Sequence, residues 1–343
     1  MSIVKLLAIG MALIAPAAVS HAQESPGFYQ GKTIRLVVGA AAGGGYDIMA
    51  RVLAIHMARH IPGSPAIVVE NMPGATGLIM ANYLYRSAPR DGLVIGMPTN
   101  NVPVESRLKL MSRDGGNVAF DAEKFGWIGS PVEDPQVFFT LSTAANSIAM
   151  LKQNKVIVGA TGPTADNYSA PQLLKRLIGA NIDIVTGYQG QNEIFEAIER
   201  GEAQGNSTGS TNVFVTKADW LREGKITLLA QFGSERARGM PNVPTAIELA
   251  DNVNSREMLR MFGLKYKLAR PLMAPPGVIA PRLALLRRAF DDTMRDPEFL
   301  AEAKAINIDV SPVSGAEIVR LLDGLREAPN DVVDQLREVL AGG

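Results

Sequence analysis

The strongest constraint on the fold is a β-branched run that stops at a glycine and is followed, beyond further glycines, by helical spacing. Residues 33–38 read Thr-Ile-Arg-Leu-Val-Val, and Ile48, Val52 and Ile55 then recur at steps of four and three until Pro62. This order predicts a strand, a glycine loop and a helix. The alternation continues with a strand at 67–69, a helix at 77–86 and a strand at 93–97. It predicts a βαβαβ unit and a parallel sheet.

A second α/β unit begins near residue 156. The expected later elements are strands at 156–158, 182–185, 203–206, 226–229 and 308–310, with helices at 170–178 and 192–200. From Pro281 the pattern is mainly helical, because Pro281 suits a first helical turn and Asp296 and Ser314 suit caps. At roughly 100 to 200 residues per domain, a chain of this length is expected to form two domains.

The composition excludes several classes of protein. The 34 basic residues balance the 34 acidic ones, so the chain lacks the positive excess that binding to nucleic acid requires. It contains no cysteine, which excludes disulfides, thiolate metal sites and cysteine nucleophiles. We expect a folded protein with no nucleic acid among its partners.

The first 22 residues have the pattern of a secretory signal. Lys5 supplies a positive start, residues 6–19 are mostly apolar, and Ser20 to Ala22 present small residues where a signal peptidase cleaves. The apolar stretch is shorter than the roughly 20 residues of a membrane-spanning helix. We expect cleavage after Ala22, and a mature chain from Gln23 that is free in a periplasm.

The glycine loop at Gly43 to Gly45 is the first candidate binding site, because it joins the expected first strand to the expected first helix. Loops of this kind let an anion approach backbone N–H groups at a helix N-terminus. A phosphate loop would need Gly-Lys-Ser/Thr at its end, and a dinucleotide fingerprint would need glycine or alanine at Ile48. We therefore expect neither a nucleotide phosphate nor a dinucleotide in this loop. The alternative to an anion-binding loop is a tight turn that is rich in glycine and binds nothing. Asp47 fits a helix cap or a partner of Arg51 better than a catalytic acid.

A second turn, residues 159–167, follows the 156–158 strand in the same way. Two such loops that face each other across a cleft would hold one anionic group from both sides. Tyr46 and Tyr188 lie at strand–helix turns, where packing is more common than ligand contact.

Two other motifs fail as catalytic or metal sites. Gly205 to Gly209 matches the G-x-S-x-G nucleophile elbow, but that hydrolase order needs a histidine after Ser207, and every histidine precedes it. His56 and His60 have the spacing of a metal pair, but Met57 stands where a zincin has glutamate. We predict no metal site, no cofactor and a half-exposed helix face around these histidines.

Several stretches together resemble the extracytoplasmic solute receptors of tripartite tricarboxylate transporters, the Bug or TctC family. They are Gly31 to Val38, Gly43 to Asp47, Val69 to Ala75, Thr99-Asn100, Gly187 to Gly190, Pro241 to Thr245 and Ala274 to Gly277. The likeness runs in order across nearly all of the chain after residue 22. It implies an α/β fold of the type II periplasmic-binding-protein (Venus flytrap) architecture, with parallel-rich sheets flanked by helices. It also implies a discontinuous first domain, 23–131 plus 262–343, and a second domain, 132–261.

The resemblance also implies a site and partners. In the family, backbone groups and waters of two loops hold a ligand carboxylate. With the polar residues at neighbouring strand ends, the expected site comprises Ala42, Gly43, Gly44, Gly45, Tyr46, Asp47, Asn100, Gly162, Pro163, Thr164, Ala165, Asp166, Asn167, Tyr188, Gln189, Ser207 and Thr208. The expected partners are a small mono-, di- or aromatic carboxylate and membrane permease subunits, with the receptor a monomer. An exported hydrolase or lyase and a ligand-sensing module for signalling remain alternatives.

Overall fold

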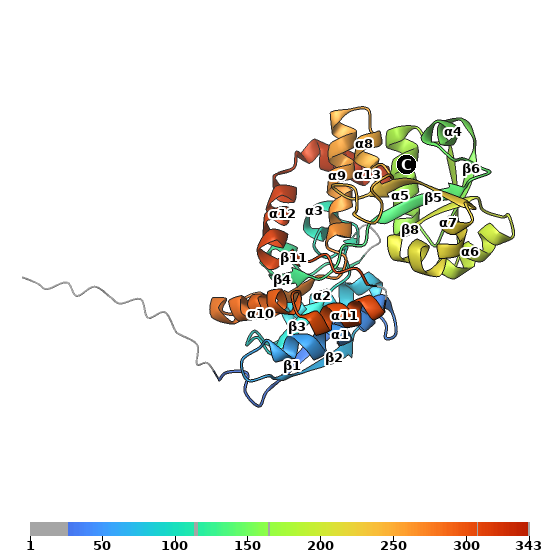
Figure 1. Ribbon diagram of the computed structural model, residues 1–343. Coiled ribbons are helices and arrows are strands. Elements are labelled where there is room, and N and C mark those ends of the chain that lie inside the picture. Colours follow the sequence, from blue (N-terminus) through green and yellow to red (C-terminus); the bar gives the residue numbers. More distant parts are fainter. Residues whose placement is uncertain (1–26, 113–115, 164, 307, 342–343) are drawn as a thin grey trace, which may run out of the picture.

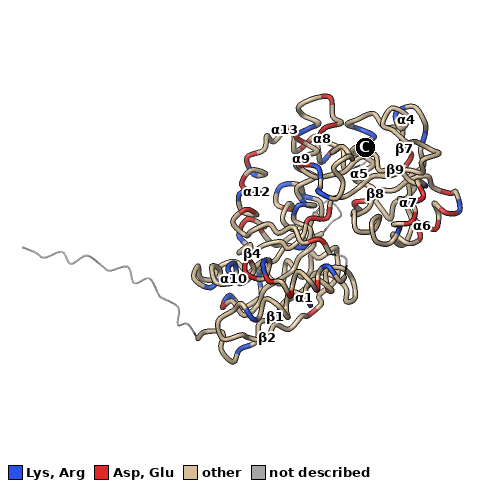
Figure 2. Tube along the Cα trace, viewed as in Figure 1, with Lys and Arg blue, Asp and Glu red and all other residues tan. Residues whose placement is uncertain are grey.

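Two sheets of six and five strands organise the chain in the computed structural model, which describes residues 27–112, 116–163, 165–306 and 308–341. The expected signal segment lies outside these residues. Figure 1 shows the first sheet with α1, α10 and α11 in its lower part, and the second sheet with α6 and α7 at the upper right. Basic and acidic positions are interspersed over both parts (Figure 2).

The first sheet has the order β11-β4-β10-β3-β1-β2. Its strands are β1 (Thr33–Val38), β2 (Ala66–Asn71), β3 (Val94–Met97), β4 (Gly126–Ser130), β10 (Leu272–Ala274) and β11 (Val313–Ser314). The strand β1 pairs in parallel with β2 and β3, as the sequence predicts, whereas β10 runs antiparallel to β3 and β4. The carboxyl ends of β1 to β4 and the start of β10 therefore share one edge of this sheet.

The second sheet has the order β7-β6-β8-β5-β9. Its strands are β5 (Gln136–Leu141), β6 (Val156–Ala160), β7 (Ile182–Thr186), β8 (Gly205–Gly209) and β9 (Ile226–Phe232). The strand β6 is parallel to β7 and β8, and β5 is antiparallel to β8 and β9. One edge thus collects the carboxyl ends of β6 to β9 and the start of β5.

Helices cover both sheets. They are α1 (Gly45–Arg59), α2 (Leu78–Arg86), α3 (Glu105–Leu108), α4 (Ile148–Gln153), α5 (Asp166–Leu173), α6 (Gln191–Glu199), α7 (Ala218–Arg222), α8 (Ala246–Leu249), α9 (Val253–Lys267), α10 (Ala280–Thr293), α11 (Pro297–Ala305), α12 (Gly315–Glu327) and α13 (Asn330–Ala341). Leu36 packs in one core with side chains of α1, α10 and α11, and its neighbour Val37 packs in another with side chains of α2 and α12. Because successive strand residues point to opposite faces, the first sheet is buried on both sides.

The helices α9 and α13 pack with the second sheet. Phe262 of α9 and Val333 and Leu336 of α13 lie in one buried cluster with Phe138 of β5. The chain therefore leaves β9, runs through α9 into β10 of the first sheet, and returns at its end to the core of the second sheet.

The structure confirms most predicted elements and corrects two of the predicted strands. The expected strand at 308–310 is wrong, because residues 308–312 have no regular structure and the short β11 follows them. The expected strand at 203–206 begins later and runs on to Gly209. The caps are right: Asp296 accepts the N–H of Glu298, and Ser314 accepts the N–H of Glu317.

Candidate ligand-binding site

The first glycine loop lies where sequence reasoning places it, between β1 and α1. Residues 41–45 are exposed, and α1 begins at Gly45 with Gly44 as its N-cap. Gly43 has a φ of +78°, a conformation in which residues with a side chain are strained. The backbone of this loop therefore faces solvent directly at a helix N-terminus.

The carboxylate of Asp47 stabilises this loop through hydrogen bonds. Its Oδ2 accepts the N–H of Gly43 at 2.9 Å and the Nε–H of Arg51 at 3.0 Å. The bond from Arg51, and then that from Gly43, lowers the pKa of the buried carboxyl to about 2. This bears out the interpretation as a partner of Arg51, whereas the N-cap of α1 is Gly44, with no side-chain cap bond. The low pKa leaves Asp47 ionised rather than available as an acid.

Tyr46 connects the loop to the next strand end. Its hydroxyl accepts the backbone N–H of Asn100, which follows β3, at 3.1 Å. The guanidinium carbon of Arg270 lies 4.4 Å from the centre of its ring. Burial raises the pKa of Tyr46, and the positive charge of Arg270 opposes that increase. The structure therefore brings the predicted residues Tyr46 and Asn100 together and adds Arg270.

Arg270 reaches the loop because β10 is antiparallel. It stands two residues before Leu272, so it lies at the edge where β1 and β3 end. Its backbone N–H donates to Ser130 Oγ at 3.3 Å, and its Nη1 donates to the carbonyl of Ala269 at 3.2 Å. Its Nη2 lies 3.0 Å from the position that a Cβ of Gly45 would take. The guanidinium therefore occupies the space that the missing side chain of Gly45 leaves open.

The second loop occupies the equivalent place in the second sheet, between β6 and α5. Asn167 Oδ1 accepts the backbone N–H of Thr161 at 3.1 Å and its hydroxyl at 3.2 Å, and Ala165 closes a turn onto the carbonyl of Gly162. Pro163 is exposed at the outside of the turn. Thr164, also predicted for the site, lies outside the described residues.

An ion pair links the second loop to α9, and a hydrogen bond links α9 to the segment that follows β3. Asp166, at the start of α5, pairs with Lys265 of α9, whose side chain is 2% exposed. The ammonium of Lys265 also donates to Asn101 Oδ1, at 3.4 Å, in the segment that follows β3. The negative charges of Asp166 and Asp134 further raise the pKa of Tyr46. Lys265 therefore joins the candidate edges of the two sheets, because it contacts Asp166 on one side and, on the other, Asn101, which adjoins the Asn100 that bonds Tyr46.

The remaining predicted residues bond to or pack against other parts of the second sheet and its helices. Tyr188 packs beside Gly159 and Ile194 in the core of the second sheet, and the N–H of Gln189 donates to Glu193. Ser207 is fully buried within β8 and donates to the carbonyl of Val137. Thr208 accepts a hydrogen bond from Asn212 at 2.7 Å. The strand–turn–helix geometry of a nucleophile elbow is absent at Ser207, which lies in mid-strand.

The histidines form a structural junction. His56 Nε2 lies 2.7 Å from Glu302 Oε2, and His60 Nε2 lies 3.1 Å from Asp296 Oδ2, both across the α1–α11 contact. The expected half-exposed face is wrong for His56, which is buried because α11 covers it. No group of ligating side chains that could hold a metal occurs among residues that the structure describes.

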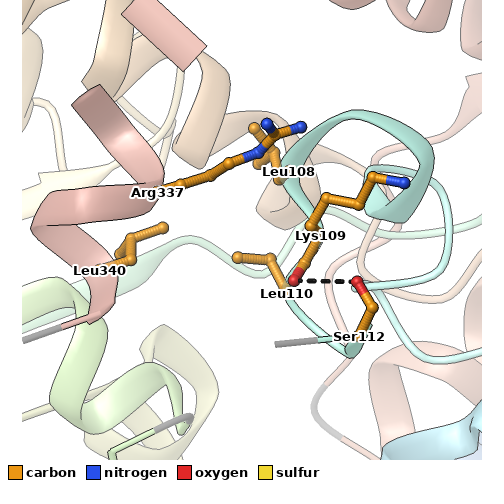
Figure 3. Close-up of a pocket in the computed structure, with 6 residues that line it drawn as sticks. All are labelled: Leu108, Lys109, Leu110, Ser112, Arg337 and Leu340. Atoms are coloured by element: carbon orange, nitrogen blue, oxygen red, sulfur yellow. Dashed lines mark hydrogen bonds between the residues drawn. The ribbon is translucent and has the colours of Figure 1, made fainter. Parts of the chain in front are cut away.

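Two cavities lie away from the glycine loops. One of about 220 Å³ is lined by Leu108, Leu110, Arg337 and Leu340, where the segment after α3 meets α13 (Figure 3). Another cavity, of about 570 Å³, has Glu105, Lys109, Asn117 and Glu123 among its lining residues. Neither contains a predicted site residue.

Sequence reasoning missed Arg270, Lys265 and Asp134. Asp134 precedes β5 as Arg270 precedes β10, and it accepts a hydrogen bond from the hydroxyl of Ser210 at 3.1 Å. Both residues stand just before an antiparallel strand, at the edge where neighbouring parallel strands end. A charged residue followed by proline just before a strand, as in Asp134-Pro135 and Arg270-Pro271, is the signal that could have found them.

Comparison with curated proteins finds relatives over most of the chain. A UPF0065 protein in the gbd 5′ region of Cupriavidus necator is 27% identical over 299 residues, 85% of this chain and 84% of the relative. The protein BugT of Bordetella pertussis is 25% identical over 302 residues, 86% of each chain.

Solved structures share the fold. A TctC solute-binding protein from Polaromonas, solved without ligand, has a TM-score of 0.69 at 18% identity and covers 90% of this chain and 99% of that one. MatC from Rhodopseudomonas palustris, with bound malate, has a TM-score of 0.58 at 20% identity, over 90% and 99% of the chains. Another R. palustris protein, solved with adipate, has a TM-score of 0.59 at 18% identity, over 91% and 98%.

The two-sheet fold, with a loop at the edge of each sheet, is similar to that of periplasmic solute-binding proteins of known structure. The model of the tripartite tricarboxylate transporter family receptors matches residues 49–334, and the chain belongs to that family. Within the described ranges, no helix is both long and apolar enough to cross a bilayer.

Proposed function

We propose that this receptor captures a small mono-, di- or aromatic carboxylate between two domains and delivers it to the permease of a tripartite tricarboxylate-type transporter. We propose that the chain is exported, that residues 1–22 are removed on export, and that the mature protein acts as a monomer in the periplasm. Its proposed domains are 23–131 plus 262–343, and 132–261. All strands of the first sheet fall in the former and all strands of the second in the latter, which supports this division for the sheets, whereas α13 of the former packs with the second sheet.

The joining of the two edges through Lys265 is the observation that carries this proposal. The first loop offers exposed backbone and the N-terminus of α1, and Asp166 of the second loop is linked through Lys265 to Asn101, next to the Asn100 that bonds Tyr46. N–H groups and partial positive charge at a helix N-terminus favour an anion. Malate in MatC and adipate in the second R. palustris protein are both dicarboxylates, which supports this ligand class.

The proposed site contains all of the residues predicted from the sequence, and we divide them into a centre and a periphery. Its centre is Ala42 to Asp47 with Asn100 on one side, and Gly162 to Asn167 on the other. Tyr188, Gln189, Ser207 and Thr208 are proposed for its periphery, because their polar groups already have partners or pack in the second sheet.

A thermal-shift screen tests the ligand class. Malate, adipate and benzoate are compared with adipamide, the neutral diamide that matches adipate in length. A ligand at 100 times its dissociation constant should raise the free energy of unfolding by about 2.7 kcal/mol. We expect at least one carboxylate to stabilise the protein and adipamide to have little effect. No stabilisation by any carboxylate at millimolar concentration would contradict the proposed function.

A further inference from the structure

We infer that the guanidinium of Arg270 pairs with a carboxylate of the ligand and makes the receptor select the ionised acid over its neutral analogues. The inference rests on the proposed function and adds the side chain that recognises charge. It concerns a residue at the start of β10, outside both glycine loops.

Arg270 is a cation at the candidate edge that no carboxylate neutralises among the described residues. Its side chain is half-buried, and its hydrogen bond within the protein goes to the carbonyl of Ala269. The other arginine beside the loop, Arg51, is already paired with Asp47. A half-buried guanidinium beside an open loop favours an anionic partner from outside the chain.

The second cation at this edge cannot serve in the same way. Lys265 is buried, and its ammonium is neutralised by Asp166 and further bonded to Asn101. A ligand carboxylate would have to displace Asp166 to reach it. Arg270 is therefore the positive charge that the described site leaves for the ligand.

The position of Arg270 is fixed before any ligand binds. The ring of Tyr46 supports one face of the guanidinium, and the N–H of Asn100 fixes the hydroxyl end of that ring. Nη2 lies over Gly45, so the edge of the guanidinium adjoins the exposed backbone at the start of α1. A planar fork held in this way matches the two oxygens of a carboxylate.

The test is calorimetric titration of malate, adipate and benzoate into the wild type and into Arg270→Gln, Arg270→Lys and Arg90→Gln. Arg90 is exposed and precedes β3, at the opposite edge of the first sheet, so its variant removes the same charge far from the loops. We expect Arg270→Gln to weaken the carboxylate that binds best at least tenfold. Arg270→Lys should retain part of the affinity, and Arg90→Gln should retain all of it.

Each outcome has a separate meaning. Binding of no carboxylate to the wild type would overturn the proposed function, and this inference with it. Unchanged affinity in a folded Arg270→Gln protein would overturn the inference alone, as would an equal loss in Arg90→Gln. Should the glutamine variant fail to fold, Arg270→Lys decides: wild-type affinity in it would show that the fork geometry does not recognise the ligand.

Discussion

Replacing Gly45 with valine should weaken carboxylate binding at least tenfold, about 1.4 kcal/mol, while the protein remains folded. A Cβ at this position would lie 3.0 Å from Nη2 of Arg270, and the branches of valine would extend further into the same space. Valine should therefore displace the guanidinium and cover the backbone at the start of α1. Isothermal titration against the carboxylate that binds best measures the effect.

The matched control is Gly324→Val in α12. Gly324 is exposed, and no atom lies within 4 Å of the position of its Cβ. The same substitution there should leave affinity unchanged. Wild-type affinity in a folded Gly45→Val protein would show that the site has been placed on the wrong loop.

Replacing Asp166 with asparagine should destabilise the protein by about 3 kcal/mol, because it leaves the ammonium of Lys265 buried without a carboxylate. The reverse change, Lys265→Met, should cost less, about 1 kcal/mol, because Asp166 is 27% exposed and water can solvate the carboxylate left behind. Urea unfolding of both single variants and of the double variant measures these effects. The double variant should be more stable than Asp166→Asn alone.

An exposed ion pair supplies the control. Lys155 and Asp183 lie 2.8 Å apart with side chains 65% and 52% exposed, so Asp183→Asn should have little effect on the free energy of unfolding. An equally small effect of Asp166→Asn would show that the Lys265–Asp166 pair does not fix the second loop to α9.

The elements that follow from sequence are those whose packing leaves a periodic pattern. Residues 33–38 form β1 because alternate side chains enter the two cores of a sheet buried on both faces. The strand β4 gave no such signal because it contains two glycines. A Cβ at Gly129 would lie 2.2 Å from the ring of Phe290, so α10 requires glycine there. The strand β8 is predicted only in part, at 203–206, because the run Gly205 to Gly209 is polar although it is central in its sheet.

The candidate site also contains residues that local sequence predicts and residues that it does not predict. The two glycine loops follow from sequence because they join a strand to a helix, a local arrangement. Arg270 and Lys265 do not, because their roles depend on contacts between segments far apart in the chain. Arg270 meets Tyr46 only because β10 enters the first sheet antiparallel, and Lys265 meets Asp166 only because α9 crosses between the sheets.

Small-angle scattering of the exported protein, with and without a saturating carboxylate, measures whether the two domains close on the ligand. If each glycine loop holds one side of the same ligand, the two domains must approach each other for both to reach it. We predict a smaller radius of gyration once calorimetry shows that the site is saturated. An unchanged radius at saturation would contradict a receptor that closes on its ligand between the two loops.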